Sequence, residues 1–131
     1  MKDLKGKVAL VTGAAMGMGR SLSEDLLREG CSVILVDVNQ QELSKTLADL
    51  LKIGKCASYI CDISDRKAVY QLASQVEKKF GQVDILVNNA GIVKALELLD
   101  LPDDAIEKTI NINLTAQFWT CKAFLPAMIK K

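Results

Sequence analysis

The chain has 131 residues, which suits a single domain over residues 1–131, and half of these residues are apolar. Its 17 lysines and arginines nearly balance its 16 acidic residues, so no nucleic-acid partner is expected, because a surface that binds phosphates carries an excess of positive charge. The sequence has no histidine and no Cys-x-x-Cys pair, which argues against a bound metal. The charged N-terminus and the short first apolar run argue against a signal sequence or a membrane association, and a cytoplasmic location is expected.

Short apolar runs alternate with apolar residues at helical spacing along most of the chain. In chain order these patterns predict a strand at Val8–Val11, a helix from Met18 to the residue before Gly30, a strand at Ser32–Val36, a helix over residues 43–51, a strand at Cys56–Cys61, a helix over residues 68–80 and a strand at Val83–Val87. Leu22, Leu26 and Leu27 form the apolar stripe of the first helix, and a glycine follows each helical stretch as a stop signal.

A long helix is expected in the last part of the chain. Pro102 occupies the position of a first-turn proline that opens a helix. Apolar residues then continue at helical spacing, with a bend expected near Asn111 and Asn113. The predicted stripe consists of Ile106, Ile110, Leu114, Phe118, Cys121 and Leu125.

The order of strands and helices predicts the fold class. Strands that are apolar throughout and separated by helices are typical of a parallel sheet covered on both faces. Right-handed crossovers then give an open, doubly wound α/β sheet of the Rossmann-like type, with strand order 3-2-1-4 and truncated after about four strands.

The turn between the first strand and the first helix is rich in glycine. Residues 12–19 read Thr-Gly-Ala-Ala-Met-Gly-Met-Gly. In a strand–turn–helix unit, such glycines permit a tight turn, let the backbone approach a pyrophosphate and allow close helix–strand packing. The start of the helix also presents free N–H groups to an anion. The alternative is a glycine turn that holds no ligand.

An acidic residue, Asp37, ends the second predicted strand. Its carboxylate can accept hydrogen bonds from both hydroxyls of an adenosine ribose, and it would repel a 2′-phosphate. Val38, Asn39 and Met16 offer no cation to offset that repulsion, so NAD is favoured over NADP as the cofactor. The alternative is an aspartate that caps the next turn.

The fourth strand is followed by Asn88-Asn89-Ala90-Gly91. Small residues at the carboxyl end of a strand let a cofactor lie against the backbone, and the asparagine side chains can bond to neighbouring strands. Without the other motifs, a plain Asn/Gly loop explains this stretch equally well.

Taken together, these motifs resemble the short-chain dehydrogenase/reductase family. The resemblance rests on the glycine motif at Thr12–Gly19, Asp37, Asp62 after the third strand, the Asn-Asn-Ala-Gly stretch and Asn113, and it spans the whole chain. The stretch Phe118–Met128 further resembles the branch of this family that acts on retinoids, steroids and other lipophilic alcohols. The family resemblance implies an oxidoreductase that interconverts an alcohol and a carbonyl by hydride transfer with NAD(P).

The resemblance also implies a role for individual residues. The loop residues Gly13, Ala15, Met16, Gly17, Met18 and Gly19 would lie along the dinucleotide, Asp37 would hold the adenosine ribose, Asp62 and Ile63 would touch the adenine, and Asn89, Ala90 and Gly91 would border the nicotinamide half. Asn113 would be a catalytic residue that holds a water in a proton relay. Its alternative role is to satisfy backbone groups at the helix bend.

This sequence departs from the family in one respect, because it lacks the family's acid/base pair. The pair consists of a tyrosine with a lysine four positions later, together with a serine upstream. Here Tyr59 is followed four residues later by Ile63, and Tyr70 by Ser74, so neither forms the pair. We therefore expect this chain to represent the cofactor-binding part of the enzyme, with the fourth strand as an open sheet edge that invites pairing with another chain.

Two other functions remain open from the sequence. One is a non-catalytic module that binds NAD or associates, as a homo-oligomer or with relatives, through the sheet edge and the last helix. The other is a different Rossmann-like enzyme, such as a methyltransferase that uses S-adenosylmethionine, which would lack the combination of the glycine motif with Asn-Asn-Ala-Gly.

Overall fold

The computed structural model describes residues 3–130 and contains one parallel sheet. Its strands are β1 (Val8–Thr12), β2 (Ser32–Asp37), β3 (Cys56–Ile60) and β4 (Ile85–Val87), and their order is β3-β2-β1-β4. In the register, Leu10 of β1 lies opposite Ile34 of β2 and Leu86 of β4. The predicted strand order and the parallel α/β architecture are confirmed.

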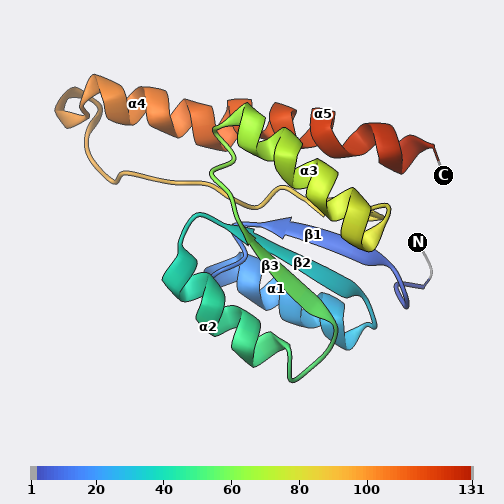
Figure 1. Cartoon of the computed structure of the whole chain (residues 1–131). Helices are drawn as coiled ribbons and strands as arrows, with labels where there is room; N and C mark the ends of the chain where they lie inside the picture. The colour runs from blue at the N-terminus through green and yellow to red at the C-terminus, as the bar shows by residue number, and fades with distance from the viewer. Residues whose placement is uncertain (1–2, 131) are drawn as a thin grey trace.

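Helices cover both faces of this sheet (Figure 1). Helices α1 (Gly17–Arg28) and α2 (Gln40–Leu50) lie on one face. Helix α3 (Arg66–Phe80) lies on the other face with α4 (Asp103–Ile110), a π-helical turn η2 (Asn111–Thr115) and α5 (Ala116–Ile129). The bend expected near Asn111 and Asn113 is this π-helical turn. A short 3₁₀ turn, η1 (Leu98–Asp100), lies in the loop between β4 and α4.

Two hydrophobic clusters fill the spaces between the layers. Successive strand residues point to opposite faces, so Val11 and Leu35 pack against α1 and α2, whereas Leu10 and Ile34 pack against α3 and α5. All four side chains have no measurable solvent exposure. Burial on both faces explains why these strands are apolar at every position rather than at alternate ones.

Several local predictions need correction. Strand β4 begins at Ile85 rather than Val83, because the Asp84 carboxylate takes the first backbone N–H of β1, that of Val8, at 2.9 Å. Helix α4 begins after Pro102, which is its N-cap rather than its first-turn residue. Leu22 is 38% exposed, because it lies at the edge of the α1 face that buries Gly19, Ser23, Leu26 and Leu27.

Most residues of the long apolar stripe predicted after Pro102 face solvent rather than the sheet. Ile110, Leu114, Phe118 and Leu125 are all exposed, whereas α5 buries Ala116, Thr120 and Phe124. Both faces of this helix are rich in apolar residues, so the spacing of the larger side chains could not identify the face that packs on the sheet.

Candidate functional site

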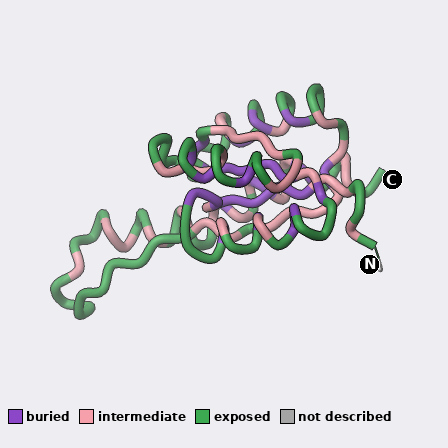
Figure 2. The backbone as a smooth tube through the Cα atoms, turned by 90° about the horizontal axis from the view of Figure 1, so that it is seen from below, coloured by how far each residue is buried: buried purple, intermediate pink, exposed green. Residues whose placement is uncertain are grey.

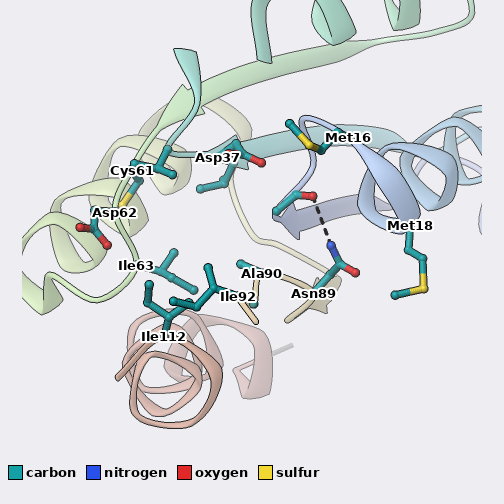
Figure 3. A pocket seen from close by; sticks show the side chains of 14 residues that line it. Met16, Met18, Asp37, Cys61, Asp62, Ile63, Asn89, Ala90, Ile92 and Ile112 are labelled. Atoms are coloured by element: carbon teal, nitrogen blue, oxygen red, sulfur yellow. Dashed lines mark hydrogen bonds between the residues drawn. The ribbon is translucent and has the colours of Figure 1, made fainter. Parts of the chain in front are cut away.

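A pocket of about 350 Å³ opens at the carboxyl ends of the strands (Figure 3). The predicted residues that line it are Gly13, Met16, Met18, Asp37, Asp62, Ile63, Asn89, Ala90 and Gly91. Residues separated by nearly eighty positions in sequence thus meet at one site. In open α/β sheets, ligands bind at this end of the strands, beside the point where the strand order reverses, which here lies between β1 and β4.

The glycine loop is shaped by two close approaches and one open position. A side chain at Gly13 would place its Cβ 2.8 Å from the Cα of Ala90, and one at Gly19 would collide with the carbonyl oxygen of Gly13. At Gly17, whose φ is +60°, an added Cβ would meet no atom within 4 Å. Two glycines therefore let the loop, α1 and β4 pack together, while Gly17 leaves room for a ligand to approach the backbone.

The loop is fixed by hydrogen bonds from the second βα unit. The backbone N–H of Ala14 donates to the carbonyl of Val36 at 3.2 Å. The buried hydroxyl of Thr46, in α2, donates to the carbonyl of Ala15 at 2.6 Å. Ala15, predicted as a cofactor contact, is 1% exposed and does not line the pocket, so it acts in holding the loop.

The N-terminus of α1 lies at this pocket, which Met16 and Met18 line. The first N–H groups of a helix have no partner within the helix, and they carry a partial positive charge. Within the described part of the chain no side chain caps this end at Met16, and the first turn holds no acidic residue. By contrast, Asn39 caps α2 and Asp65 caps α3. The start of α1 is thus available to a phosphate group.

Asp37 is oriented by two backbone N–H groups. One carboxylate oxygen accepts the N–H of Ala15 at 3.0 Å, and the other accepts the N–H of Asn39 at 2.9 Å. The alternative role as a turn cap is therefore present in the structure. It does not exclude a ligand, because each carboxylate oxygen has a second acceptor position and Asp37 also lines the pocket.

Asn89 and Thr12 join the glycine loop to the end of β4. The Asn89 side-chain amide donates to the carbonyls of Thr12 at 3.0 Å and Gly13 at 3.2 Å, and the second of these bonds is drawn in Figure 3. The Thr12 hydroxyl accepts the backbone N–H groups of Asn89 and Ala90, both at 3.0 Å. The prediction that an asparagine here bonds to a neighbouring strand is confirmed.

The other wall of the pocket follows β3. One oxygen of Asp62 accepts both the N–H and the hydroxyl of Ser64, at 3.0 and 2.7 Å. Ile63 is buried, and with Ile92 and Ile112 it forms an apolar surface in Figure 3. Burial, with a smaller contribution from Asp62 and Asp65, raises the pKa of the Cys61 thiol to about 11, so this thiol is protonated and unreactive at neutral pH.

Asn113 is exposed and is not among the residues that line the pocket. Its side-chain oxygen accepts the N–H of Ile92 at 2.8 Å, and its amide donates to the carbonyl of Ile92 at 2.7 Å. Nearby, the Gln117 amide donates to the carbonyls of Ile112 and Ala90. The side chain of Asn113, which lies at the helix bend, thus satisfies the backbone groups of Ile92 in the loop after β4, and both of its polar groups are engaged.

Sequence reasoning missed some of the residues that build this pocket. Its lining also includes Val36, Val38, Cys61, Ile92 and Ile112. The first three adjoin predicted residues at strand ends, so their positions could have been inferred. Ile112 belongs to the π-helical turn, and no local motif marks it. Thr46 was missed for the same reason, because it supports the loop from a helix 31 residues away.

The family model for short chain dehydrogenases matches residues 7–131, and the chain belongs to this family. Epidermal retinol dehydrogenase 2 of Mus musculus is 45% identical over 98% of this chain and 42% of its own length. Estradiol 17-beta-dehydrogenase 11 of the same species is 39% identical over 98% of this chain and 44% of its own length. The chain thus spans less than half the length of these curated relatives.

Solved structures agree with this assignment. An NAD⁺-bound xylitol dehydrogenase is 35% identical, with a TM-score of 0.93 over 98% of this chain and 50% of its own. The RhlG/NADP complex of Pseudomonas aeruginosa is 30% identical, with a TM-score of 0.91 over the same shares of the two chains. The resemblance to the retinol and steroid branch is confirmed among the curated relatives. None of the described helices is long and apolar enough to cross a membrane.

Proposed function

We propose that this chain binds NAD(P) as the cofactor-binding part of an oxidoreductase that interconverts a lipophilic alcohol and its carbonyl. The observation that carries this proposal is the uncapped N-terminus of α1 and the carboxylate of Asp37 in one pocket. A group with a central pyrophosphate and an adenosine ribose matches this pair of features. Gly17 supports the fit, because its backbone faces open space.

Each wall of the pocket has a distinct role in this proposal. The loop Gly13–Gly19 would hold the pyrophosphate, Asp37 the adenosine ribose, and Asp62 with Ile63 the adenine. Asn89, Ala90 and Gly91 would border the nicotinamide half, whose ring supplies the hydride chemistry when bound. Asn113 would contribute to catalysis as a positioning residue, because it holds Ile92 and the π-helical turn beside that half.

We further propose that the pocket prefers NAD to NADP. The Asp37 carboxylate would meet the 2′-phosphate of NADP with like charge, and among the lining residues none is basic. The test is a titration with NADH and with NADPH, followed by energy transfer from Trp119. NADH is expected to bind at least about tenfold more tightly, the range of one lost charged hydrogen bond.

Asp37→Asn should narrow that preference, because it removes the charge while keeping the size of the side chain. Asp100→Asn is the matched control, since Asp100 is exposed and lies outside the pocket. Equal affinity for the two cofactors in the parent chain would contradict the preference. Failure of a folded chain to bind either would contradict the cofactor site itself.

The substrate proposal follows from the retinol and estradiol dehydrogenases among the relatives. It is tested with NAD⁺ and a panel of retinol, a 17β-hydroxysteroid and xylitol, by following NADH absorbance. Turnover of the two lipophilic alcohols alone would support it, and turnover of xylitol alone would contradict it. Binding of NADH without any turnover would favour the non-catalytic module for this chain.

We also propose that the chain self-associates through α5 and the edge of β4. Phe118 is 61% exposed and Leu114 56%, and within residues 3–130 β4 is bonded only to β1. Phe118→Lys is expected to shift sedimentation toward the monomer. Tyr70→Lys, on the exposed side of α3, is the matched control. A monomer at all concentrations would contradict the proposal.

A further inference from the structure

Two methionine thioethers flank the mouth of the pocket. Met16 is 52% exposed and Met18 is 82% exposed, and both belong to its lining. Figure 3 shows Met16 on the side of Asp37 and Met18 on the side of Asn89. Met128, in α5, is partly buried against the hydrophobic cluster between the sheet and α3. The two loop methionines are therefore more accessible to a dissolved oxidant than Met128.

Oxidation of either methionine would affect ligand binding, because both sulfur-containing side chains lie at the N-terminus of α1. Met16 is the N-cap of α1 and Met18 lies in its first turn, where no described side chain caps the free N–H groups. A sulfoxide places a polar oxygen acceptor on a side chain that was apolar. That oxygen would lie beside the donors that a pyrophosphate needs, so it would compete with the ligand for them.

We propose that Met16 and Met18 form an oxidation-sensitive site, at which peroxide lowers the affinity of the pocket for its dinucleotide. The inference rests on the proposed cofactor site. In the reaction, hydrogen peroxide transfers one oxygen atom to the thioether sulfur. The O–O bond breaks and an S–O bond forms, so the sulfur loses two electrons to become a sulfoxide and the peroxide leaves as water.

Three of the four thiols of the chain compete weakly for this oxidant. Cys31 and Cys61 are buried, and burial raises the pKa of both thiols, so the reactive thiolate is scarce at neutral pH. Burial also raises the pKa of Cys56. A bound dinucleotide would cover the loop, so it should protect Met16 and Met18 from the same reagent that weakens its binding.

The experiment combines peptide mass spectrometry with cofactor titration. The purified chain is treated with limiting hydrogen peroxide, with and without NADH, and is then reduced with a thiol reagent that restores cysteines but not methionine sulfoxides. We expect oxygen to be added at Met16 and Met18 before Met128, and more slowly with NADH present. NADH affinity should fall at least about fivefold, the range of one lost hydrogen bond. Methionine sulfoxide reductases should restore it.

Two variants separate this effect from other damage. The affinity of a Met16→Leu/Met18→Leu chain, whatever its value, should be the same before and after peroxide, because leucine has no sulfur. A Met128→Leu chain should lose affinity as the parent does.

Oxidation of Met128 as fast as the loop methionines, or equal NADH affinity of the parent before and after oxidation, would overturn the inference and leave the cofactor site standing. An untreated chain that binds neither NADH nor NADPH would overturn both.

Discussion

The two halves of the molecule differ in how completely their apolar residues are covered. Through β1, α1, β2 and α2, the strand interiors have at most 1% exposure. From β4 onward, all three strand residues are only partly buried, α4 contains no buried residue, and Leu99 is 97% exposed. Figure 2 shows the loop before α4 as an exposed arm that extends from the body.

The difference follows from the number of neighbours that each element has. Strands β1 and β2 are bonded on both edges and covered on both faces, whereas β4 is bonded to β1 alone within the described residues. An apolar residue is buried only where elements lie on every side of it. The packed half therefore contributes Asp37, at the proposed adenosine end of the pocket, and the open half contributes Asn89, at the proposed nicotinamide end.

The largest expected effect is at Gly19, where α1 packs against the glycine loop. Gly19→Ala should lower the free energy of unfolding by at least about 3 kcal/mol, because its Cβ would collide with the backbone carbonyl of Gly13. Gly81→Ala is the matched control. Gly81 has φ of +73° and ψ of −138°, but an added Cβ would meet nothing within 4 Å, so roughly 1–3 kcal/mol of backbone strain is expected without a collision. Urea titration measures both, and equal losses would contradict the close approach.

A truncation in each half tests the difference in burial directly. Leu35→Ala should cost about 3 kcal/mol of unfolding free energy, because it removes a side chain with no exposure from the packed half. Leu99→Ala should cost less than about 0.5 kcal/mol in a monomeric sample, because the same side chain is almost fully exposed there. Thermal denaturation at low protein concentration compares them. Similar losses would show that the arm is packed in solution.

The hydroxyl of Thr12 ties the halves together, and its removal should have an intermediate effect. Thr12→Val leaves the backbone N–H groups of Asn89 and Ala90 without their acceptor, at a cost of roughly 2 kcal/mol. Thr12→Ser keeps the acceptor and should recover most of that loss. Hydrogen exchange at residues 89 and 90 should accelerate in the valine variant alone. Unchanged exchange there would contradict the role of this hydroxyl.

The smallest expected effect is a pH dependence at Cys61, directly after β3. The Cys61 pKa is raised from 9.0 to about 11 by burial, so below pH 9 the thiol is neutral in both states and its stabilisation is complete. As the pH rises toward 11, only the unfolded chain ionises, and the unfolding free energy should fall by roughly 1–2 kcal/mol. Cys61→Ala should flatten this fall in urea titrations at each pH, whereas Cys121→Ala should keep it. An equal slope in both variants would contradict the assignment.

The candidate site could be predicted best where local sequence and local chemistry coincide. The glycine loop, Asp37 and Asn89 each follow a strand, and parallel strands bring such positions to one end of the sheet. Ile112 and Thr46 could not be predicted, because each reaches the site from a helix whose rotation is set by packing. The family resemblance singled out Asn113, but the bond between its side chain and the backbone of Ile92 could not be predicted, because the two residues meet only in the folded chain.

Local sequence patterns are enough to predict the alternation of strands and helices, the parallel sheet and the glycine-rich end of the site. These features depend on short-range periodicity and on residue types that few conformations accept. The buried face of α5, by contrast, depends on how the whole chain packs. Ala116, Thr120 and Phe124 pack inward while Phe118 and Leu125 remain exposed. The physical reason is that burial depends on which elements surround a side chain in space, and an apolar helix can present either face to the sheet.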